Sequence, residues 1–559
     1  MRVCLYDMPD TNARTRFLLV YPKTPDTYWS YKYALPFVRK KALLPPLGLA
    51  TIAAMMPDEI DCTIVDCNTS VLTDSRIRGA DMVLVSAMIV QKDSFAEIVR
   101  RCNEAGVPVV AGGPYPTSCM DEIDGVDHFV LGEGERSFRA FLSDFADGSL
   151  KPVYRPSGKP EMCESPIPRY DLLSVRDYET MPVQFSRGCP FDCEFCDIVS
   201  LFGHKTRTKD PEQLLAELDA IYATGFGGSV FVVDDNFIGN KRRSKELLRH
   251  IIGWQERHGY PFHLSTEASI NLAGDDELLD LMVRSGFTMV FVGIESPSDD
   301  SLEGAGKAQN LRYDVKAAVR KIQERDIEVT AGFIIGFDTD TPDIFERQIR
   351  FIQELAVPTA MVGLLMALPN TRLHQRLSKE GRMLGTANGN NTHAATLNFQ
   401  TRLPRELLEE GYRHVLRTIY SPRRYYDRCL ALLDRLPAKR PIAEFGTGSI
   451  SVRDIAALLQ SIIRQTFSWY GPEYLRYVMK AVWKRPFQIV HTITMSVLGH
   501  HFMTITRKSL AKHRSRRVEM RRFRRMLAEI GDARGRLPLG HTVFDKAGAD
   551  GTIAVGSEG

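Results

Sequence analysis

The chain has 559 residues, of which 44% are hydrophobic and 25% charged. This composition excludes a wholly disordered chain and a small disulfide scaffold, and the length predicts about three domains. Residues 402–525 hold 26 Lys and Arg against 9 Asp and Glu, so one end of the protein is expected to meet anions. We expect no signal peptide, because Met1–Thr15 lacks an apolar core. We expect no membrane span, because no run of about 18 apolar residues occurs. We also expect a cytoplasmic protein.

Residues 1–150 are predicted to form a doubly wound, Rossmann-like (flavodoxin-like) α/β domain. Apolar runs alternate with helical stretches at 47–55 and 94–104, which indicates buried parallel strands. The predicted strands are 17–21, 62–65, 82–85, 107–111 and 128–131.

Ligands of such sheets bind beyond the carboxyl ends of the strands, where this sequence has three loops rich in small residues. These loops either let the backbone approach a large flat ligand or only form tight turns. Their residues are Ser86, Ala87 and Met88; Gly112, Gly113 and Pro114; and Gly132, Glu133, Gly134 and Glu135.

Residues 151–180 are rich in Pro, Gly and Ser and are predicted to be a linker. Residues 181–400 show six strand–helix units, which predict a partial (β/α) barrel with its function at the carboxyl ends of the strands. Residues 401–526 are predicted to be a mainly helical domain and 527–559 a flexible tail. The barrel strands are expected at 183–186, 229–233, 262–266, 289–292, 328–335 and 360–367, and the C-terminal helices at 403–420, 422–435, 449–465, 472–484 and 489–502.

Cys189, Cys193 and Cys196 stand together in the loop after the first predicted barrel strand. The spacing C-x3-C-x2-C lets one loop supply three thiolates to a 4Fe–4S cluster, which leaves one iron free to bind another ligand. A structural zinc site usually needs a fourth protein ligand. His204 is the nearest candidate, and no second Cys/His pair lies near. The cluster is favoured, with zinc or a chance spacing as the alternatives.

With Phe195 directly before the third cysteine, this motif resembles that of the radical S-adenosylmethionine (SAM) superfamily. In that family the open iron binds the amino and carboxyl groups of SAM, and one electron cleaves SAM to methionine and a 5′-deoxyadenosyl radical. Later strand ends resemble the family's SAM-contacting segments, although carboxylates there often serve only as helix caps. The resemblance implies SAM contacts by Phe195, Asp234, Asp235, Glu267, Glu295 and Ile335.

The N-terminal sheet resembles the cobalamin-binding domain fused to many radical SAM enzymes, chiefly at loops 111–114 and 132–135. The resemblance implies that the residues of the three small-residue loops contact cobalamin. The chain lacks the D-x-H-x-x-G motif whose histidine ligates cobalt, and residues 21–25 read Tyr-Pro-Lys-Thr-Pro instead. The resemblance therefore implies that cobalamin is bound without a histidine ligand to cobalt. The alternative is a domain that has lost its cofactor.

These cofactors together imply a C-methyltransferase. An unactivated carbon needs a radical for methylation, because general bases of ordinary pKa cannot remove its proton. The resemblance implies that the deoxyadenosyl radical removes hydrogen, that methylcobalamin gives the methyl group, and that two SAM molecules are consumed per turnover. The alternatives are a non-methylating radical reaction, such as ring formation or oxidation, and RNA modification. Methylthiolating tRNA enzymes have a second three-cysteine cluster upstream, and the cysteines here are not spaced for one.

The layout over residues 16–500 resembles enzymes with a C-terminal domain of unknown function, among them the hopanoid C-2 and C-3 methylases. Residues 21–32, 45–49 and 369–373 carry this resemblance. It implies a hydrophobic, hopanoid-type lipid substrate and a reductant protein of flavodoxin or ferredoxin type.

Residues 507–525 contain ten Lys and Arg against Glu519, and they follow an apolar stretch at 487–504. An apolar helix before a polybasic segment suits an anionic membrane surface. We therefore expect peripheral contact with the inner face of the cell membrane through the basic C-terminal helices, and no nucleic-acid partner. The alternatives are a core helix for the apolar stretch and a solvated or nucleic-acid-binding face for the arginines.

Overall fold

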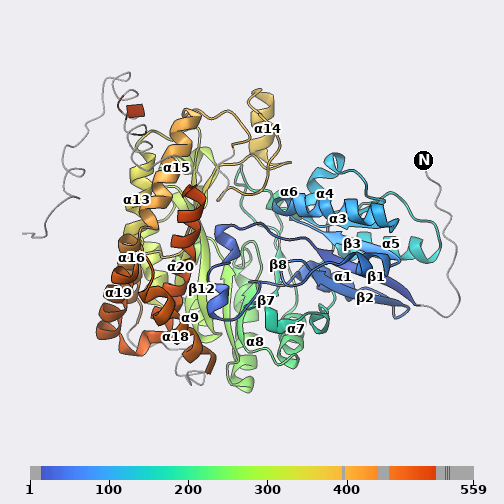
Figure 1. Ribbon diagram of the computed structural model, residues 1–559, viewed down its shortest axis with the longest axis horizontal. Coiled ribbons are helices and arrows are strands. Elements are labelled where there is room, and N and C mark those ends of the chain that lie inside the picture. The colour runs from blue at the N-terminus through green and yellow to red at the C-terminus, as the bar shows by residue number, and fades with distance from the viewer. Residues whose placement is uncertain are drawn as a thin grey trace, which may run out of the picture. The chain divides into compact units, whose positions relative to one another are not determined.

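The computed structural model describes residues 14–392, 397–437 and 452–511, together with positions 523, 525, 526 and 528. The chain forms one compact unit over Met1–Lys512 and a second over His513–Gly559. All helices and strands named below belong to the first unit (Figure 1).

The N-terminal sheet has six parallel strands in the order β2-β1-β3-β4-β5-β6. The first five strands in this order match the predicted flavodoxin-like winding, and each predicted strand is confirmed to within two residues. The sixth, β6 (Val153–Tyr154), lies in the stretch that was predicted to be a linker, where Val153 pairs with Phe129 of β5. The other strands are β1 (Thr15–Tyr21), β2 (Ile60–Asp66), β3 (Met82–Ser86), β4 (Val109–Gly112) and β5 (His128–Val130).

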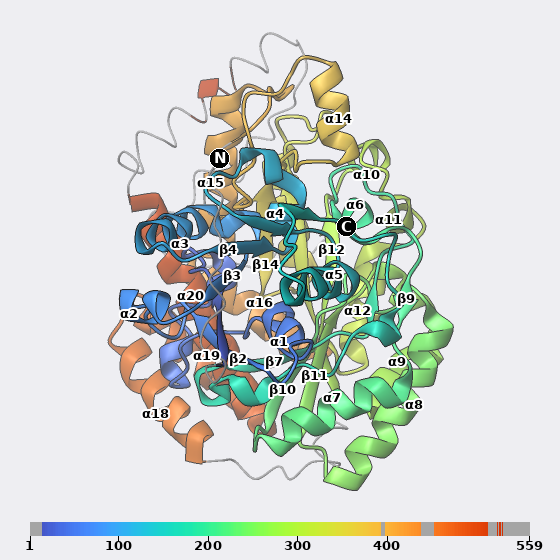
Figure 2. The ribbon, with the colours of Figure 1, turned by 90° about the vertical axis from the view of Figure 1, so that its right-hand side faces the viewer.

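Helices cover both faces of this sheet because its strands are apolar on both sides. Along β1, Leu18 and Val20 pack in one hydrophobic cluster, whereas Phe17 and Leu19 pack in the other. The first cluster is closed by α2 (Asp74–Arg78) and α3 (Lys92–Ala105), and the second by α1 (Leu47–Ala53) and α5 (Gly134–Ala146) (Figure 2).

The central sheet has six parallel strands in the order β14-β13-β12-β11-β10-β7. Strands β7 and β14 lie at opposite ends of this order, which gives the open, partial barrel that was predicted. The strands are β7 (Thr180–Val183), β10 (Gly228–Val232), β11 (Phe262–Glu267), β12 (Phe287–Glu295), β13 (Glu328–Ile335) and β14 (Ala360–Leu364), and their helices are α7 (Pro211–Ala223), α8 (Lys241–His258), α9 (Asp276–Arg284), α12 (Val315–Glu324) and α13 (Ile344–Glu354).

The first barrel strand begins three residues earlier than predicted and ends at Val183. The residues after it leave the barrel, and β8 (Ser186–Arg187) pairs antiparallel with β9 (Arg207–Thr208). The cysteine loop is therefore enclosed by a small two-stranded sheet of its own.

The C-terminal helices are packed around α20 (Ile489–Ala511). Met495, Phe502 and Met503 of this helix are at most 1% exposed. The expectation that the apolar stretch 487–504 faces a membrane is therefore wrong, because α20 carries apolar residues on several sides and four neighbouring helices cover it. These neighbours are α15 (Arg405–Ile419), α16 (Pro422–Arg435), α18 (Val452–Thr466) and α19 (Gly471–Lys484).

Among the described residues, no helix is both long and apolar enough to cross a membrane. Most of the basic segment 507–525 lies outside the described residues.

The connection from β1 to α1 reaches the C-terminal helices. The hydroxyl of Tyr28 lies 2.7 Å from Thr506 Oγ1, and the Tyr28 ring stacks on Tyr420 and Phe502. His501 Nε2 lies 3.0 Å from the Tyr28 carbonyl oxygen. The two ends of the first unit are thus joined through a buried aromatic cluster.

We expect Gly411→Ala to destabilise the protein. A Cβ at Gly411 of α15 would lie 2.2 Å from Cε1 of Phe345, whose buried ring on α13 has no room to move. Such overpacking costs about 1–3 kcal/mol, which thermal unfolding followed by circular dichroism would detect. Gly48→Ala in α1 is the matched control, since its Cβ would meet no atom within 4 Å. Equal melting temperatures for the two variants would contradict this packing.

Candidate active site

The three cysteines lie on the loop between β8 and α6 (Ile198–Phe202). The loop is pressed against its own hairpin at Gly188, where φ is +92° and a Cβ would lie 2.6 Å from the Lys205 carbonyl oxygen. Only glycine fits this conformation without strain. The Cys189 N–H donates to the Gly203 carbonyl oxygen at 3.2 Å, which fixes the start of the cysteine motif.

Three side chains from other elements reach the cysteine sulfurs. Asn236 Nδ2 lies 3.9 Å from Cys189 Sγ, and Gln309 Nε2 lies 3.7 Å from Cys193 Sγ. Burial raises the pKa of the Cys196 thiol, and the nearby Lys307 ammonium opposes this rise. Donors and a cation of this kind stabilise thiolates. Gln309 and Lys307 were not predicted, because more than 110 residues separate them from the cysteines.

The described residues contain no group of three or more His, Cys, Asp or Glu side chains that could hold a single metal ion. In a 4Fe–4S cluster each cysteine binds a different iron, so the sulfurs do not need to meet at one point.

Asp234 follows β10 and is fully buried. It accepts hydrogen bonds from the Phe185 N–H at 2.8 Å and from the Ser186 hydroxyl at 2.6 Å, one on each carboxylate oxygen. Burial raises its pKa to about 6, although these bonds oppose the rise. Both oxygens hold the strand that enters the cysteine loop, and the SAM contact expected of Asp234 stays a prediction.

Asp235 and Glu267 are better placed for a ligand. Asp235 Oδ2 is buried without a hydrogen-bond partner. Burial raises the pKa of Asp235 to about 7, with repulsion by Asp234 as the next cause. Burial and then Asp235 raise the pKa of Glu267, at the end of β11, to about 8. A buried, unpartnered carboxylate fits a cationic group such as the ammonium of SAM.

Glu295 ends β12 with φ at +66° and pairs with Lys307 at 2.7 Å. Lys307 Nζ also lies 5.9 Å from the ring centre of Phe195. The Glu295 carboxylate is thus held by the cation that faces the cysteines. Ile335 is fully buried, and it is Ile334 that packs with Phe195 against the cluster around Phe337. The SAM contact expected of Ile335 stays a prediction.

The small-residue loops of the N-terminal domain come together. Gly113 has φ at +89°, and a Cβ there would lie 2.6 Å from Ser86 Oγ. The Thr117 hydroxyl donates to the Gly113 carbonyl oxygen at 2.7 Å and accepts from the Gly132 N–H at 2.9 Å. Ala87 is buried beside Gly112, whereas Met88 is 42% exposed at the rim. These close approaches hold the three loops together at the carboxyl edge of the sheet, and we call the three loops the cradle.

Glu133 and Glu135 form ion pairs with arginines of the cysteine hairpin. Arg187, two residues before Cys189, pairs with Glu133 at 2.9 Å and with Glu135 at 2.7 Å. Arg207 of β9 pairs with Glu133 at 2.8 Å. Burial alone would raise the pKa of Glu135, but Arg187 more than offsets it and holds that pKa below its usual range. Both carboxylates bind the cysteine hairpin, and the cobalamin contacts expected of Glu133 and Glu135 stay predictions.

Gly134 between them is packed against α1. A Cβ at this position would lie 2.7 Å from Cδ1 of Ile52. The glycine is explained by the close approach of α5 to α1, and no ligand is needed to account for it.

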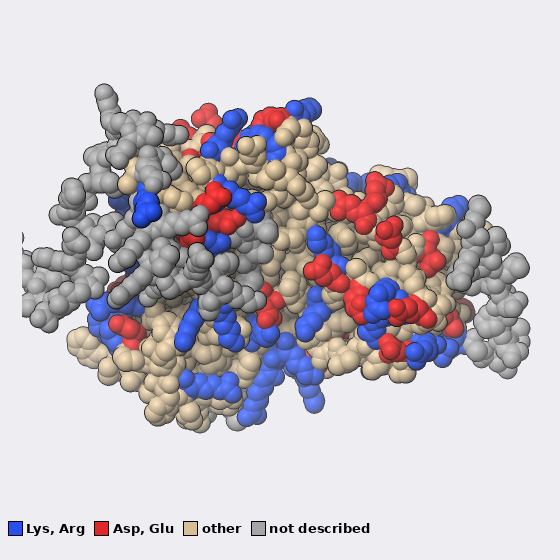
Figure 3. All heavy atoms as spheres, turned by 45° about the horizontal axis from the view of Figure 1, so that its top comes forward, with Lys and Arg blue, Asp and Glu red and all other residues tan. Residues whose placement is uncertain are grey.

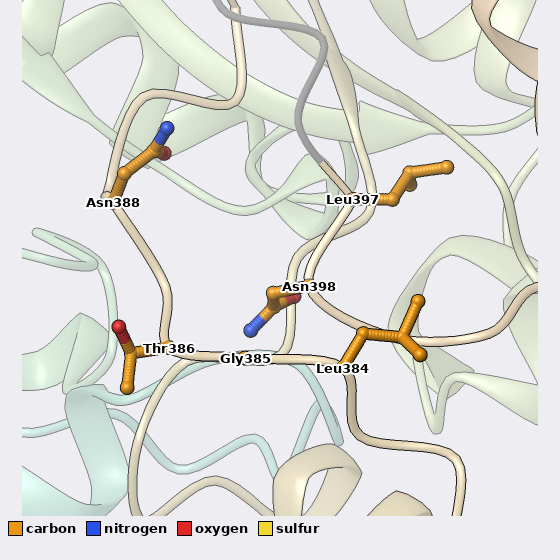
Figure 4. Close-up of a pocket in the computed structure, with 6 residues that line it drawn as sticks. All are labelled: Leu384, Gly385, Thr386, Asn388, Leu397 and Asn398. Atoms are coloured by element: carbon orange, nitrogen blue, oxygen red, sulfur yellow. The ribbon is translucent and has the colours of Figure 1, made fainter.

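A small cavity of about 190 Å³ lies between two stretches of chain after β14 (Figure 4). This volume is below the roughly 300–1,000 Å³ of pockets for drug-sized ligands. The first stretch continues to Gly389, where a Cβ would lie 2.3 Å from Cγ2 of Ile89 in the loop after β3. The stretch therefore joins the end of the barrel to the small-residue loops. The cavity is lined by Leu384, Gly385, Thr386, Asn388, Leu397 and Asn398.

Residues 39–142 match the B12 binding domain family, residues 183–352 the radical SAM superfamily, and residues 371–515 a domain of unknown function, DUF4070. An uncharacterized methyltransferase of Synechocystis is 41% identical over 498 residues, which cover 87% of this chain and 91% of the relative. The hopanoid C-2 methylase of Rhodopseudomonas palustris is 32% identical over 512 residues, which cover 89% and 95%.

The chain belongs to the cobalamin-binding radical SAM methyltransferases. The cofactors of this methyltransferase are accordingly a 4Fe–4S cluster, SAM and cobalamin. Two solved structures show the same fold. OxsB with aqua-cobalamin aligns with a TM-score of 0.54 at 15% identity over 93% of this chain and 84% of its own. TsrM from Kitasatospora setae aligns with a TM-score of 0.53 at 17% identity over 67% and 78%.

We expect Glu133→Gln to destabilise the methyltransferase by about 3 kcal/mol or more, because it leaves the Arg207 charge buried with only carbonyl partners. Thermal or denaturant unfolding measures the loss. Glu164→Gln is the matched control: its ion pair with Arg136 lies at the surface, where solvent screens it, so its effect should be clearly smaller. Equal losses for both variants would show that the buried pairs do not hold the hairpin.

Proposed function

We propose that this protein transfers a methyl group to an unactivated carbon of a hydrophobic substrate, a hopanoid-type lipid. The observation that carries the proposal is the buried set of ion pairs between Glu133 and Glu135 and the arginines of the cysteine hairpin. It links the cobalamin-binding half of the chain to the three-cysteine loop, and methylation at carbon needs both cofactors at one substrate.

In this proposal Cys189, Cys193 and Cys196 hold the cluster, with Asn236, Gln309 and Lys307 stabilising their thiolates. Asp235 and Glu267 receive the methionine and ribose parts of SAM. The cradle around Gly113 receives cobalamin, with Ser86, Ala87, Met88, Gly112, Pro114 and Gly132. When bound, these cofactors supply a carbon-centred radical and a methyl donor. An external one-electron donor of flavodoxin or ferredoxin type completes the reaction.

A partly exposed aromatic pair supports an apolar substrate. Trp29, from the connection after β1, packs on Phe291 of β12 with ring centres 5.2 Å apart and is 43% exposed. Phe291 in turn lies against Gly332, where a Cβ would approach its ring to 3.0 Å. This apolar surface is next to the strand end that carries Glu295. The hopanoid C-2 methylase relative, which this chain spans almost entirely, is the second support.

Replacing any one of the three cysteines by Ala should abolish the brown absorbance of the reconstituted cluster and all SAM cleavage. The physical reason is that three thiolates are the minimum that holds the cluster while one iron stays open. Cys163→Ala is the control, since Cys163 is exposed and outside the loop. Iron content, visible absorbance and 5′-deoxyadenosine formation are the measurements. SAM cleavage that survives in a cysteine variant would contradict the assignment.

Methyl-labelled SAM separates methylation from other radical reactions. With reductant and a hopanoid substrate, we expect the label in the product and two SAM molecules consumed for each methyl group transferred. Mass spectrometry of the lipid and quantification of S-adenosylhomocysteine and 5′-deoxyadenosine provide the readout. Deoxyadenosine formed with an unlabelled, altered product would instead favour ring formation or oxidation.

A further inference from the structure

The outer sides of α18 and α19 carry a large apolar surface. On α19, Leu475, Met479, Val482 and Trp483 follow the spacing i, i+4, i+7, i+8, which places them on one side of a helix. The opposite side, with Tyr474 and Tyr477, is buried against the other C-terminal helices. The full set of exposed apolar residues, called here the α18–α19 face, is Leu459, Ile462, Ile463, Phe467, Trp469, Leu475, Met479, Val482 and Trp483.

The apolar side chains of the α18–α19 face are unusually exposed to solvent. Phe467 and Trp483 are each 87% exposed and Met479 is 67% exposed. Single exposed apolar residues are ordinary, but a contiguous set with aromatic members marks a contact surface. Phe467 and Trp469 lie in the short connection between the two helices, so the apolar side chains run continuously from one helix to the other.

The exposed charged side chains described on the two helices of the face are basic, and the exposed carboxylate of Asp434 on the neighbouring α16 pairs with one of them, Lys484. Among the described residues 456–490, the exposed charged side chains are Arg464, Lys480 and Lys484, and no carboxylate is exposed. Glu473 is half-buried and paired with Arg476, while Lys484 is paired with Asp434 of α16. Figure 3 shows a largely tan surface at lower left, on the side of the C-terminal helices, with blue and fewer red groups, whereas red and blue alternate on the first domain at right.

We propose that the α18–α19 face docks on the surface of an anionic phospholipid bilayer. Apolar and aromatic side chains flanked by Lys and Arg, with no exposed carboxylate among the described residues 456–490, are the composition of helices that lie in a membrane interface. A protein partner of matching shape would not require this excess of exposed basic side chains on the two helices. The proposal places the membrane contact on α18 and α19, because α20, where the sequence predicted it, is covered. The docking itself does not depend on the proposed lipid substrate, whereas the biological reason for docking rests on the proposed function.

The test is vesicle sedimentation with the full chain. Vesicles contain phosphatidylglycerol and phosphatidylcholine, or phosphatidylcholine alone, and no hopanoid, so that binding is measured independently of catalysis. We expect the protein to bind the anionic vesicles, and to bind less as salt is raised. The double variant Met479→Ser/Trp483→Ser should reduce this binding by at least about tenfold, because it removes two large apolar side chains from the contact.

Val71→Ser is the matched control, since Val71 is 77% exposed on the N-terminal domain, and its binding should equal that of the unmodified protein. Unmodified protein that stays in the supernatant, or a double variant that binds as well as the control, would overturn the proposal. The docking proposal would also be overturned if the unmodified protein formed a dimer in light scattering and the double variant did not. That result would show that the face binds a second copy of the chain.

Methylation of a detergent-dispersed substrate separates this proposal from the proposed function. We expect the double variant to retain that activity and to lose turnover on substrate embedded in vesicles. Vesicle binding by an unmodified protein that never methylates a hopanoid would refute the proposed substrate and leave the docking surface in place.

Discussion

Glu133 and Glu135 of the N-terminal domain bind Arg187 and Arg207 of the cysteine hairpin. The rest of the active site depends on this contact. The four side chains are almost wholly removed from water. A buried charge without its partner costs several kcal/mol, so the pairs can form well only in one arrangement. The small-residue loops of the N-terminal domain and the cysteine loop are therefore held in a defined position relative to each other.

The other side of the cysteine loop is held by the barrel. Asp234 holds the strand before it, Asn236 and Gln309 contact the sulfurs from two later segments, and Lys307, two residues before Gln309, lies near them. Each of these residues follows a parallel strand or the helix after it. Because parallel strands end at the same edge of a sheet, residues far apart in sequence meet there. The fold therefore holds the side chains of the site in position, and it gathers several buried carboxylates at this edge of the sheet.

The C-terminal helices combine two roles. Their inner side, centred on α20 and Tyr28, joins the β1–α1 connection to the barrel and so supports Trp29 beside Phe291. Their outer side carries the α18–α19 face. In the proposed function, the outer side meets the membrane that holds the substrate, and the inner side supports the aromatic pair of Trp29 and Phe291.

The sequence by itself determined the local features: the alternating strands, the three-cysteine loop and the glycines at Gly113 and Gly132. These depend on periodicity, spacing and backbone freedom, which short stretches carry in full. Only the tertiary structure decided that Glu133 and Glu135 bind arginines, that Asp234 holds a strand, that Lys307 faces the cysteines and that α20 is covered while α19 is not. The sequence around a charged or apolar residue does not show which residue its side chain contacts, because long-range packing determines that partner.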